Sequence, residues 1–517
     1  MALVSVIETR PEIIQGGMGV DVSSPRLAGA VAATGMAGVV SGTATGDVLA
    51  RRLQDGDCGV LAALSKLPDS GLVDRIKETY YKPNGRENTG KYTLIPRNFR
   101  IVDETGEVFK LYNERFNVTA EEMALAGAFM MVTQARQEAE AHLQGQDKRC
   151  GPIGINLLTE LRMPTASTLY GAMLAGADFV VMGAGIPSHI PNVLNRLAER
   201  DPTQVNIQVP GTSHKYYADF NPEDYPELGA KELERPNFLA IISLDMLGRR
   251  LASKEDTRPD GFVVEHHTAG GHNAPPRSKK VVKGQAVYDG KDEPDFEVLT
   301  KLKLPFWLAG SRGSPDGLKH AQTLGAVGVQ IGSLFALSRE SGMDPEIKVQ
   351  VLEAIRSGEL DIVKDAYASP TGFPFMVARK SGVTWPEGEE RRACEASYLT
   401  TQREVTDELG RRRLVSSCPA EPTSVYLKKM KMTGTPDDQM GDEELRSHRA
   451  KCLCRKLLGT AGIGDSGMPA IVTLGGDAIE GVGRLDKAKV TTEDGTFGAQ
   501  SVVDYILGRS EAVATLS

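Results

Sequence analysis

Short apolar runs, many of them followed by glycine, recur along the first 345 residues and are separated by stretches that suit helices. Most of the runs are apolar at nearly every position, which is typical of parallel strands buried on both faces. Helical stretches such as 165–175 and 191–200 lie between most of them, so the alternation predicts an α/β fold with a parallel sheet. Eight runs are expected to form strands: residues 12–15, 37–41, 153–156, 179–182, 205–208, 261–265, 305–308 and 327–330. Eight strands favour closure into a TIM (β/α)8 barrel, although an open doubly wound sheet would give much the same pattern.

Three segments interrupt the alternation. Residues 75–118 are polar, with a predicted hairpin around 103–106, and a long helix is expected at about 120–143. Residues 211–236 are rich in proline and charge, and are predicted to form a loop after the fifth strand, on the face where barrel active sites lie. Beyond about residue 345 the alternation stops. We therefore expect a barrel over 1–345, with insertions at about 75–145 and 211–236, and a C-terminal subdomain over 346–517.

The composition of the 517-residue chain narrows the classes of function. Its formal net charge is -8, whereas nucleic-acid-binding domains are normally basic, so nucleic acid is not an expected partner. No apolar run reaches the roughly 18 residues that can span a bilayer, and no secretory signal is evident at the N-terminus, so no membrane association is expected. Six cysteines in so long a chain do not indicate a disulfide scaffold, and the expected location is the reducing cytoplasm.

Two places at expected strand ends suit close contact with a ligand. Gly16 and Gly17, between Gln15 and Met18, allow backbone N–H groups to approach a bound molecule, although a tight turn would explain the glycine pair equally well. Asn156 ends the third expected strand, where its amide can donate to and accept from a heteroaromatic ring, or merely cap a turn.

The most informative segment runs from Thr268 to Arg277, directly after the sixth expected strand. Gly270 and Gly271 permit close backbone approach, and His272 follows them at the face where barrel enzymes carry their catalytic groups. Because an imidazole titrates near neutral pH, His272 is predicted to be a general base rather than a structural histidine.

Two further turns follow the seventh and eighth expected strands. One contains Gly310 and Ser311, the other contains Gly332 and Ser333, and each is expected to lead into a helix. Barrel enzymes commonly bind phosphate here, on loop N–H groups and helix N-termini. The two turns together therefore predict a phosphate-binding site.

In this order the motifs resemble those of the nitronate monooxygenase family, once called 2-nitropropane dioxygenases, over about residues 10–345; the continuation beyond residue 345 resembles a longer subgroup of that family. The resemblance implies a noncovalently bound FMN and a catalytic role for His272. The isoalloxazine ring and ribityl chain would then be lined by Gly17, Met18, Asn156, Gly270 and Gly271. The phosphate would be held by Gly310, Ser311, Gly332 and Ser333. The other expected cofactor-binding residues are Gln15, Gly16, Gln208, Ala269 and Gln330.

Two activities are open for such a flavoenzyme. In the first, O2 oxidises an alkyl nitronate or similar small carbanion, and His272 deprotonates a neutral nitroalkane or orients the nitronate. In the second, NAD(P)H reduces the flavin, which reduces an enoyl thioester of fatty-acid or polyketide type, with His272 as proton donor. His267, in the pair His266–His267 before the glycine motif, is the next catalytic candidate. The expected partners are a small-molecule substrate with O2 or NAD(P)H; a homodimer and a non-enzymatic flavin- or metal-binding scaffold are also left open.

A group of cysteines forms a separate candidate site in a stretch that looks poor in strands and helices. Four thiolates can complete a tetrahedral zinc site or ligate an iron–sulfur cluster. Zinc is the first expectation and a [4Fe-4S] cluster the second, whereas buried free cysteines are the structural alternative. The four expected ligands are Cys394, Cys418, Cys452 and Cys454.

Overall fold

The computed structural model describes residues 3–87, 91–97, 99–110, 117–145, 149–230, 233–380, 382–384, 394, 396–465 and 468–509. Parts of the predicted insertion at 75–118, namely 88–90, 98 and 111–116, lie outside the described residues.

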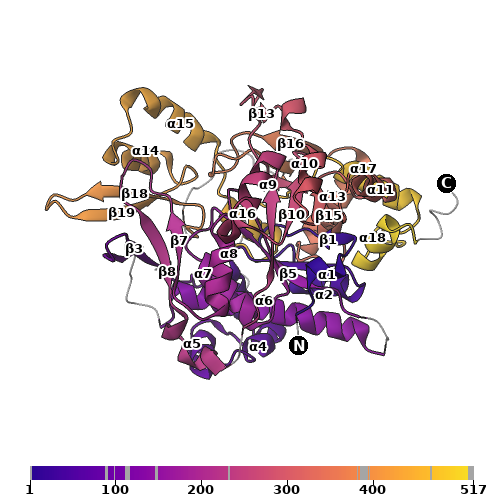
Figure 1. The fold of residues 1–517 in the computed structure, drawn as a ribbon, viewed down its shortest axis with the longest axis horizontal. Helices are drawn as coiled ribbons and strands as arrows, with labels where there is room; N and C mark the ends of the chain where they lie inside the picture. Colours follow the sequence, from indigo (N-terminus) through magenta and orange to yellow (C-terminus); the bar gives the residue numbers. More distant parts are fainter. Residues whose placement is uncertain are drawn as a thin grey trace.

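Eight parallel strands form a closed barrel at the centre of the molecule (Figure 1). They are β1 (Ile13–Gln15), β2 (Gly38–Ser41), β5 (Ile153–Leu158), β6 (Phe179–Gly183), β9 (Asn237–Ile242), β10 (Gly261–Glu265), β14 (Phe306–Ala309) and β15 (Gly328–Ile331). Each strand lies beside its predecessor in this order, and β15 pairs with β1. Hydrogen bonds from Gln15 N to Ala37 O (2.9 Å) and from Ala37 N to Ile13 O (3.1 Å) join β1 to the start of β2. These bonds complete the ring, so the predicted TIM (β/α)8 barrel is confirmed.

Helices cover the outside of the barrel. They are α2 (Pro25–Ala33), α3 (Thr45–Gln54), α4 (Cys58–Leu64), α5 (Ser70–Tyr80), α6 (Ala120–Leu143), α7 (Thr165–Leu174), α8 (Ile190–Ala198), α9 (Asp245–Ala252), α10 (Phe296–Lys301), α11 (Pro315–Thr323), α12 (Ser333–Ala336) and α13 (Pro345–Ser357), with the short α1 (Val6–Thr9) before β1. The expected long helix is α6, whose start is fixed by a capping box between Thr119 and Glu122. Since α6 packs between α2 and α7, it serves as the barrel helix that connects β2 to β5. No helix in the described part of the chain is both long and apolar enough to cross a membrane.

Successive residues of a barrel strand face two different cores. Val263 packs inside the barrel with Phe179 and Trp307, whereas Val264 packs against the surrounding helices. Burial on both faces explains why these strands are apolar throughout. By the same alternation, Glu265 at the end of β10 faces the interior of the barrel.

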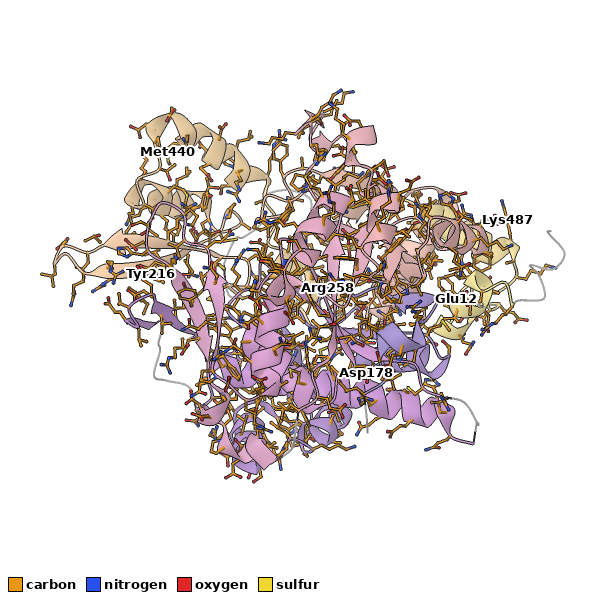
Figure 2. The ribbon with its side chains drawn as sticks, in the orientation of Figure 1. Glu12, Asp178, Tyr216, Arg258, Met440 and Lys487 are labelled. Atoms are coloured by element: carbon orange, nitrogen blue, oxygen red, sulfur yellow. The ribbon has the colours of Figure 1, made fainter. Side chains whose placement is uncertain are left out.

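Asp178, labelled in Figure 2, directly precedes β6 at the opposite end of the barrel. Its carboxylate accepts hydrogen bonds from the backbone N of Val4 (2.8 Å) and Ile153 (2.7 Å) and pairs with Arg136 at 3.0 Å. The N-terminal segment is thereby tied to the base of the barrel, away from the strand ends that form the site.

The prediction for the fifth barrel strand is wrong. Residues 205–207 belong instead to the end of β7 (Thr203–Ile207), and residue 208 directly follows it. This strand lies in an antiparallel sheet of order β4-β3-β8-β7 that also contains β3 (Arg100–Asp103), β4 (Val108–Lys110) and β8 (Tyr216–Phe220). Val205 is buried while Gln204 and Asn206 are exposed, as in a strand with one solvated face. The predicted loop at 211–236 accordingly contains β8 and two short 3-10 helices, η1 (Pro222–Asp224) and η2 (Pro226–Ala230). The hairpin predicted around 103–106 is confirmed as β3–β4.

The chain beyond residue 345 packs against the barrel at several places. Strands β16 (Asp361–Asp365) and β17 (Phe375–Arg379) join β11 (Gly271–His272), β12 (Val281–Val282) and β13 (Gln285–Ala286) in one antiparallel sheet. The hairpin β18 (Thr401–Thr406) and β19 (Arg412–Ser417) lies at the left of Figure 1 with α14 (Thr423–Met432) and α15 (Met440–Arg449). The helices α16 (Leu453–Thr460), α17 (Ala478–Lys487) and α18 (Ala499–Ile506) follow, and α17 and α18 contact α12, while α18 also contacts α2. The remaining 3-10 turns are η3 (Glu255–Thr257), η4 (Gly290–Asp292) and η5 (Asp437–Gln439).

Candidate active site

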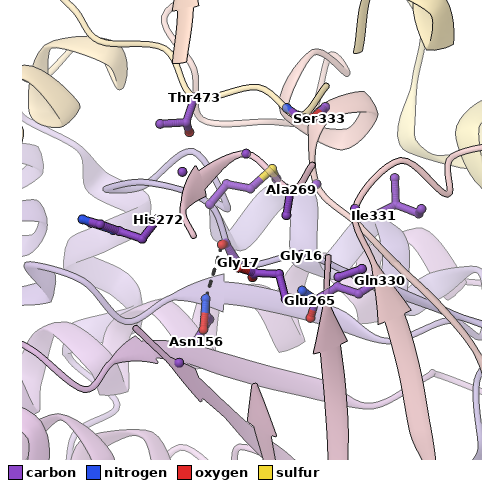
Figure 3. Close-up of a pocket in the computed structure, with 18 of the residues that line it drawn as sticks. Gly16, Gly17, Asn156, Glu265, Ala269, His272, Gln330, Ile331, Ser333 and Thr473 are labelled. Carbon is purple, nitrogen blue, oxygen red and sulfur yellow. Dashed lines mark hydrogen bonds between the residues drawn. The ribbon is translucent and has the colours of Figure 1, made fainter. Parts of the chain in front are cut away.

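A pocket opens at the C-terminal ends of the barrel strands (Figure 3). Its empty space is about 1270 Å³, including the part open to solvent, which is ample for a cofactor together with a small substrate. All eight strands, or the loops directly after them, contribute to the lining, through Gly16, Ser41, Asn156, Gly183, Ile241, Glu265, Ala309 and Gln330. This is the end of the barrel at which TIM-barrel enzymes carry their active sites.

The loop after β1 requires glycine because it lies against Asn156. A Cβ on Gly17 would be only 2.1 Å from the Cβ of Asn156, whose Nδ2 donates to Gly17 O at 3.3 Å. Gln15 supports this loop: its Nε2 donates to Gly16 O (2.6 Å) and to Ser23 Oγ (2.8 Å). Gly16, Gly17, Met18 and Asn156 all line the pocket, whereas Gln15 does not and has a structural role.

His272 lies in β11, where it pairs with Phe375 of β17. The Phe375 ring packs edge-on against the imidazole, with 4.7 Å between ring centroids, and Nε2 of His272 is 2.7 Å from the Oγ of Ser369. Burial lowers the pKa of His272 to about 4. The imidazole is therefore uncharged near neutral pH and able to accept a proton. Ala269, Gly270 and Gly271 line the pocket beside it, as expected.

Glu265 was not predicted as a site residue, yet it lines the pocket beside Gln330 (Figure 3). Burial raises the pKa of its carboxyl group to about 8, and a hydrogen bond with the Asn273 side chain only partly opposes this. The group is therefore mostly protonated at pH 7. Its place at the end of the strand 261–265 was visible in the sequence, but its burial was not.

The two turns predicted to hold phosphate meet on one side of the pocket. Gly310 and Ser311 both have positive φ values, +93° and +53°, and both line the pocket. Ser333 begins α12, and its Oγ accepts a hydrogen bond from Gly475 N at 2.7 Å. Arg312 also lines the pocket, and although burial lowers its pKa, it supplies the cation that a phosphate needs. Arg312 directly follows Ser311 in the sequence but was not among the predicted site residues.

The residues present fit an FMN molecule. Within the described part of the chain, Oδ1 of Asn156, Oε1 of Gln330 and Nε of Arg312 are buried atoms with no hydrogen-bond partner. All three residues line the pocket, and buried polar atoms without partners are costly. The two amides suit the polar edge of an isoalloxazine ring, and Arg312 suits the phosphate at the other end of the cofactor.

The sequence analysis did not anticipate that the C-terminal region would complete this pocket. Phe375, Leu457, Thr473, Gly475 and Asp477 all line it. The segment from residue 473 to 477 lies across the glycine motif, because Gly476 N donates to Thr268 O at 2.8 Å and a Cβ on Gly270 would be 2.9 Å from Gly475 N. The pair Gly475–Gly476 was the available signal in the sequence.

Two other candidates are not brought to the pocket. Gln208 is exposed and directly follows β7, so its expected role in binding the cofactor fails together with the fifth-strand assignment. His267 lies in a neighbouring small cavity, stacked on Tyr288 with 4.4 Å between ring centroids and with Nδ1 2.7 Å from Lys364 Nζ. Of the two histidines, His272 therefore lines the large pocket and His267 does not.

Comparisons with known proteins agree with the resemblance expected from the motifs. Residues 1–56 match the family model described as nitronate monooxygenase. A probable nitronate monooxygenase from Bacillus subtilis (strain 168) is 32% identical over 132 residues, which are 25% of this chain and 36% of that protein. The matched region thus spans little more than a third of the curated relative. The resemblance to the nitronate monooxygenase family is confirmed.

Solved structures with related folds are distant. FabK from Thermotoga maritima has a TM-score of 0.44 and 16% identity, over 99% of this chain and 96% of its own. Nitroalkane oxidase from Streptomyces ansochromogenes has a TM-score of 0.41 and 13% identity, over 98% of each chain. The enoyl reductase domain of MlnA, from the macrolactin biosynthesis cluster of Bacillus amyloliquefaciens, has a TM-score of 0.43 and 10% identity, over 98% of this chain and 95% of its own. These likenesses carry no functional inference.

Proposed function

We propose that this chain, which resembles the nitronate monooxygenase family, is an FMN-dependent oxidoreductase that oxidises an alkyl nitronate or a similar small carbanion with O2. The observation that carries the proposal is His272, an uncharged imidazole beside a glycine-lined pocket at the catalytic end of the barrel. A base of this kind can remove a proton from a neutral nitroalkane, or orient a nitronate that is already an anion.

When bound, FMN would supply the electron transfer between the carbanion and O2. The chain's own residues bind and orient this group. Asn156 and Gln330 would hydrogen-bond its ring, and Arg312 with the turn at Gly332 would hold its phosphate. Gly17 allows the loop after β1 to lie against Asn156. The segment 473–477 covers the glycine motif and limits access of water to the site.

The hydrogen bonds around His272 define where a proton would be accepted. Ser369 Oγ lies 2.7 Å from His272 Nε2 and 2.7 Å from Thr371 Oγ1. When Nε2–H donates to Ser369 and the Ser369 hydroxyl donates to Thr371, the unprotonated nitrogen of the imidazole is Nδ1. In that arrangement Ser369 would hold the tautomer in which Nδ1 is free to accept the substrate proton.

A second function is favoured by Glu265. An NAD(P)H-dependent flavin enoyl reductase of fatty-acid or polyketide type needs a proton donor, which an uncharged His272 supplies poorly. Burial raises the pKa of Glu265 to about 8, so its carboxyl group holds a proton at pH 7 within the same pocket. Glu265 could supply the proton for that reaction.

Anaerobic mixing separates the two functions. The purified protein should be yellow and should release FMN, rather than FAD, on denaturation. Bleaching of the flavin by propyl-2-nitronate but not by NADPH supports the oxidase, and rapid bleaching by NADPH supports the reductase. Recovery of FAD, or of no flavin even after reconstitution with FMN, would contradict both.

A further inference from the structure

The four clustered cysteines come from three separate segments of the chain, away from the pocket. Cys394 precedes β18, and Cys418 directly follows β19. Thr401, the first residue of β18, pairs with Ser417, the last residue of β19. Cys418 therefore lies at the open end of the hairpin, which is also the end nearer to Cys394 along the chain. Cys452 and Cys454 lie at the start of α16. All four are free thiols.

Direct contacts join these segments. Cys418 is buried with Ala420 and Ala450, and Cys452 packs against this small group. The backbone N–H of Leu399, in the segment before β18, hydrogen-bonds to the sulfur of Cys454 in α16.

Two of the other sulfurs have backbone donors of their own, whereas the sulfur of Cys394 lies 3.7 Å from the Oγ of Ser397. The N–H of Ala420 faces the sulfur of Cys418, and the N–H of Arg455 faces that of Cys452. Backbone N–H groups directed at cysteine sulfurs are the outer-shell bonds that orient and stabilise thiolate ligands around a metal.

The region around the cysteines has little apolar core of its own. Among the described residues, α14 buries Tyr426 and Met430, and α15 buries only Ser447. The side chain of Leu409, at the tip of the hairpin, is 74% exposed. A segment that buries so little gains most from a bound metal, because ligation free energy becomes folding free energy.

A group of histidines is the competing metal site. Among the described residues, the ligand atoms of His266, His267 and Glu293 lie within 4.8 Å of one another. However, Lys364 Nζ donates to Nδ1 of His267 at 2.7 Å, which leaves the proton of a neutral His267 on Nε2, the nitrogen nearer Glu293. A metal ion between His266, His267 and Glu293 would face the Nε2–H group of His267 and the nearby ammonium of Lys364. These three residues are therefore better explained as a hydrogen-bond network.

We propose that Cys394, Cys418, Cys452 and Cys454 together bind one zinc ion, which ties the β18–β19 hairpin to the start of α16. Four thiolates in a closed set are the ligands of a structural zinc site, and zinc needs no redox partner. The described sulfurs are spaced more widely than the ligand atoms of the histidine group, so ligation requires the side chains to turn inward about χ1.

The site would support the pocket from a distance. Leu453 of α16 packs with Phe375 and Ile471, and Leu457, one turn further along the helix, lines the pocket. Phe375 in turn contacts the His272 ring. Fixing the start of α16 therefore holds one wall of the flavin pocket in place.

The test is elemental analysis of the purified full-length protein by plasma mass spectrometry, after growth with added zinc and purification without chelators. We expect about one zinc per chain. Titration of the native protein with a mercurial in the presence of a zinc-sensitive dye should release that zinc as four thiols react. These measurements do not depend on flavin content or turnover, so they stand apart from the test of the proposed function.

Matched variants locate the ligands. Cys418→Ser and Cys454→Ser should lower the zinc content at least several-fold, whereas Cys58→Ser and Cys150→Ser, outside the cluster, should leave it unchanged. If the cluster variants do not fold, the mercurial titration of the parent still decides. A parent protein without zinc, a parent with iron and sulfide instead, or equal zinc loss in the Cys150 variant would overturn the assignment.

Discussion

At the scale of single residues, the proposed chemistry depends on the charge state of His272. His272→Asn should retain the flavin and lower kcat on a nitroalkane by about 10²–10⁴, the usual contribution of one acid–base group. Because the pKa of His272 is about 4, titration of this residue should not change the turnover of the parent between pH 6 and 8. Turnover should fall as the pH approaches 4, where the imidazole becomes protonated. The measurements are kcat per bound flavin and its pH profile. A variant that loses stability but turns over normally per bound flavin would assign His272 a packing role.

The buried carboxyl group of Glu265 should make the stability of the protein depend on pH. Its pKa is about 8 in the folded protein, against about 4.5 when unfolded. The folded state therefore holds a proton that the unfolded state releases, and the stability that depends on this proton falls as pH rises from about 4.5 to 8. Glu265→Gln removes this titration. The urea midpoint of the variant minus that of the parent should therefore increase between pH 5 and pH 9. The exposed Glu353→Gln is the control, and an equal pH trend in both variants would contradict the assignment.

Gly332 tests the phosphate end of the pocket with a matched pair. A Cβ at this position would meet only the Met18 side chain, at 3.5 Å, which is ordinary contact. Gly332→Ala should therefore bind FMN nearly as the parent does, whereas Gly332→Asp places a carboxylate against the phosphate and should abolish binding. Flavin content after reconstitution measures both. Equal occupancy in the two variants would place the phosphate elsewhere.

The residues that the sequence analysis missed have a common physical reason. Glu265 and Arg312 are charged residues at predicted strand ends, where a solvated surface role is the default expectation. What distinguishes them is burial in the pocket, whose lining also includes Phe375 and parts of the segment 473–477, far away in the sequence. The glycine motifs, Asn156 and His272 were predictable because local sequence alone places them at strand ends.

At the scale of elements, most of the fold followed from the apolar pattern. Seven of the eight barrel strands and helix α6 were predicted because buried parallel strands and a long helix leave strong local signals. The fifth strand failed because β7 alternates while β9, with Phe238 and Leu239 buried, follows it after a 30-residue excursion that resembled a loop. The nearly continuous apolar run of β9 is the pattern of a barrel strand, whereas the alternation of β7 is that of a strand with one solvated face.

The close packing of α6 on α7 requires glycine at position 171. A Cβ on Gly171 would lie 2.0 Å from the Leu125 carbonyl oxygen of α6. Gly171→Ala gains roughly 1 kcal/mol in helix propensity, but overpacking of a buried contact costs about 1–3 kcal/mol, so net destabilisation is expected. Gly483→Ala, in α17 with open space around the new methyl group, should instead stabilise by up to about 1 kcal/mol. Urea unfolding of both variants checks the signs; equal stabilisation would show that α6 and α7 separate easily.

At the scale of the whole molecule, the division predicted at residue 345 does not describe how the parts depend on each other. Leu457, Thr473 and Asp477 line the pocket, and α18 packs on α2 and α11. A fragment ending at residue 345 should therefore be insoluble or free of flavin. Expression of this fragment beside the full chain, with flavin measured in the soluble fraction, tests the point. A soluble fragment with full flavin occupancy would show that residues 1–345 fold and bind the cofactor without residues 346–517.

The position of the segment 473–477 also affects how the enzyme is made. The turn at Ser333 leaves the ribosome long before Gly475, which donates to its hydroxyl. At ordinary elongation rates the interval is roughly 7–30 s. During that time the turn at Ser333 lacks its partner Gly475, and the glycine motif at 270–271 is uncovered. If the pocket binds flavin as proposed, firm capture would therefore wait until Gly475 has been synthesised and has reached Ser333.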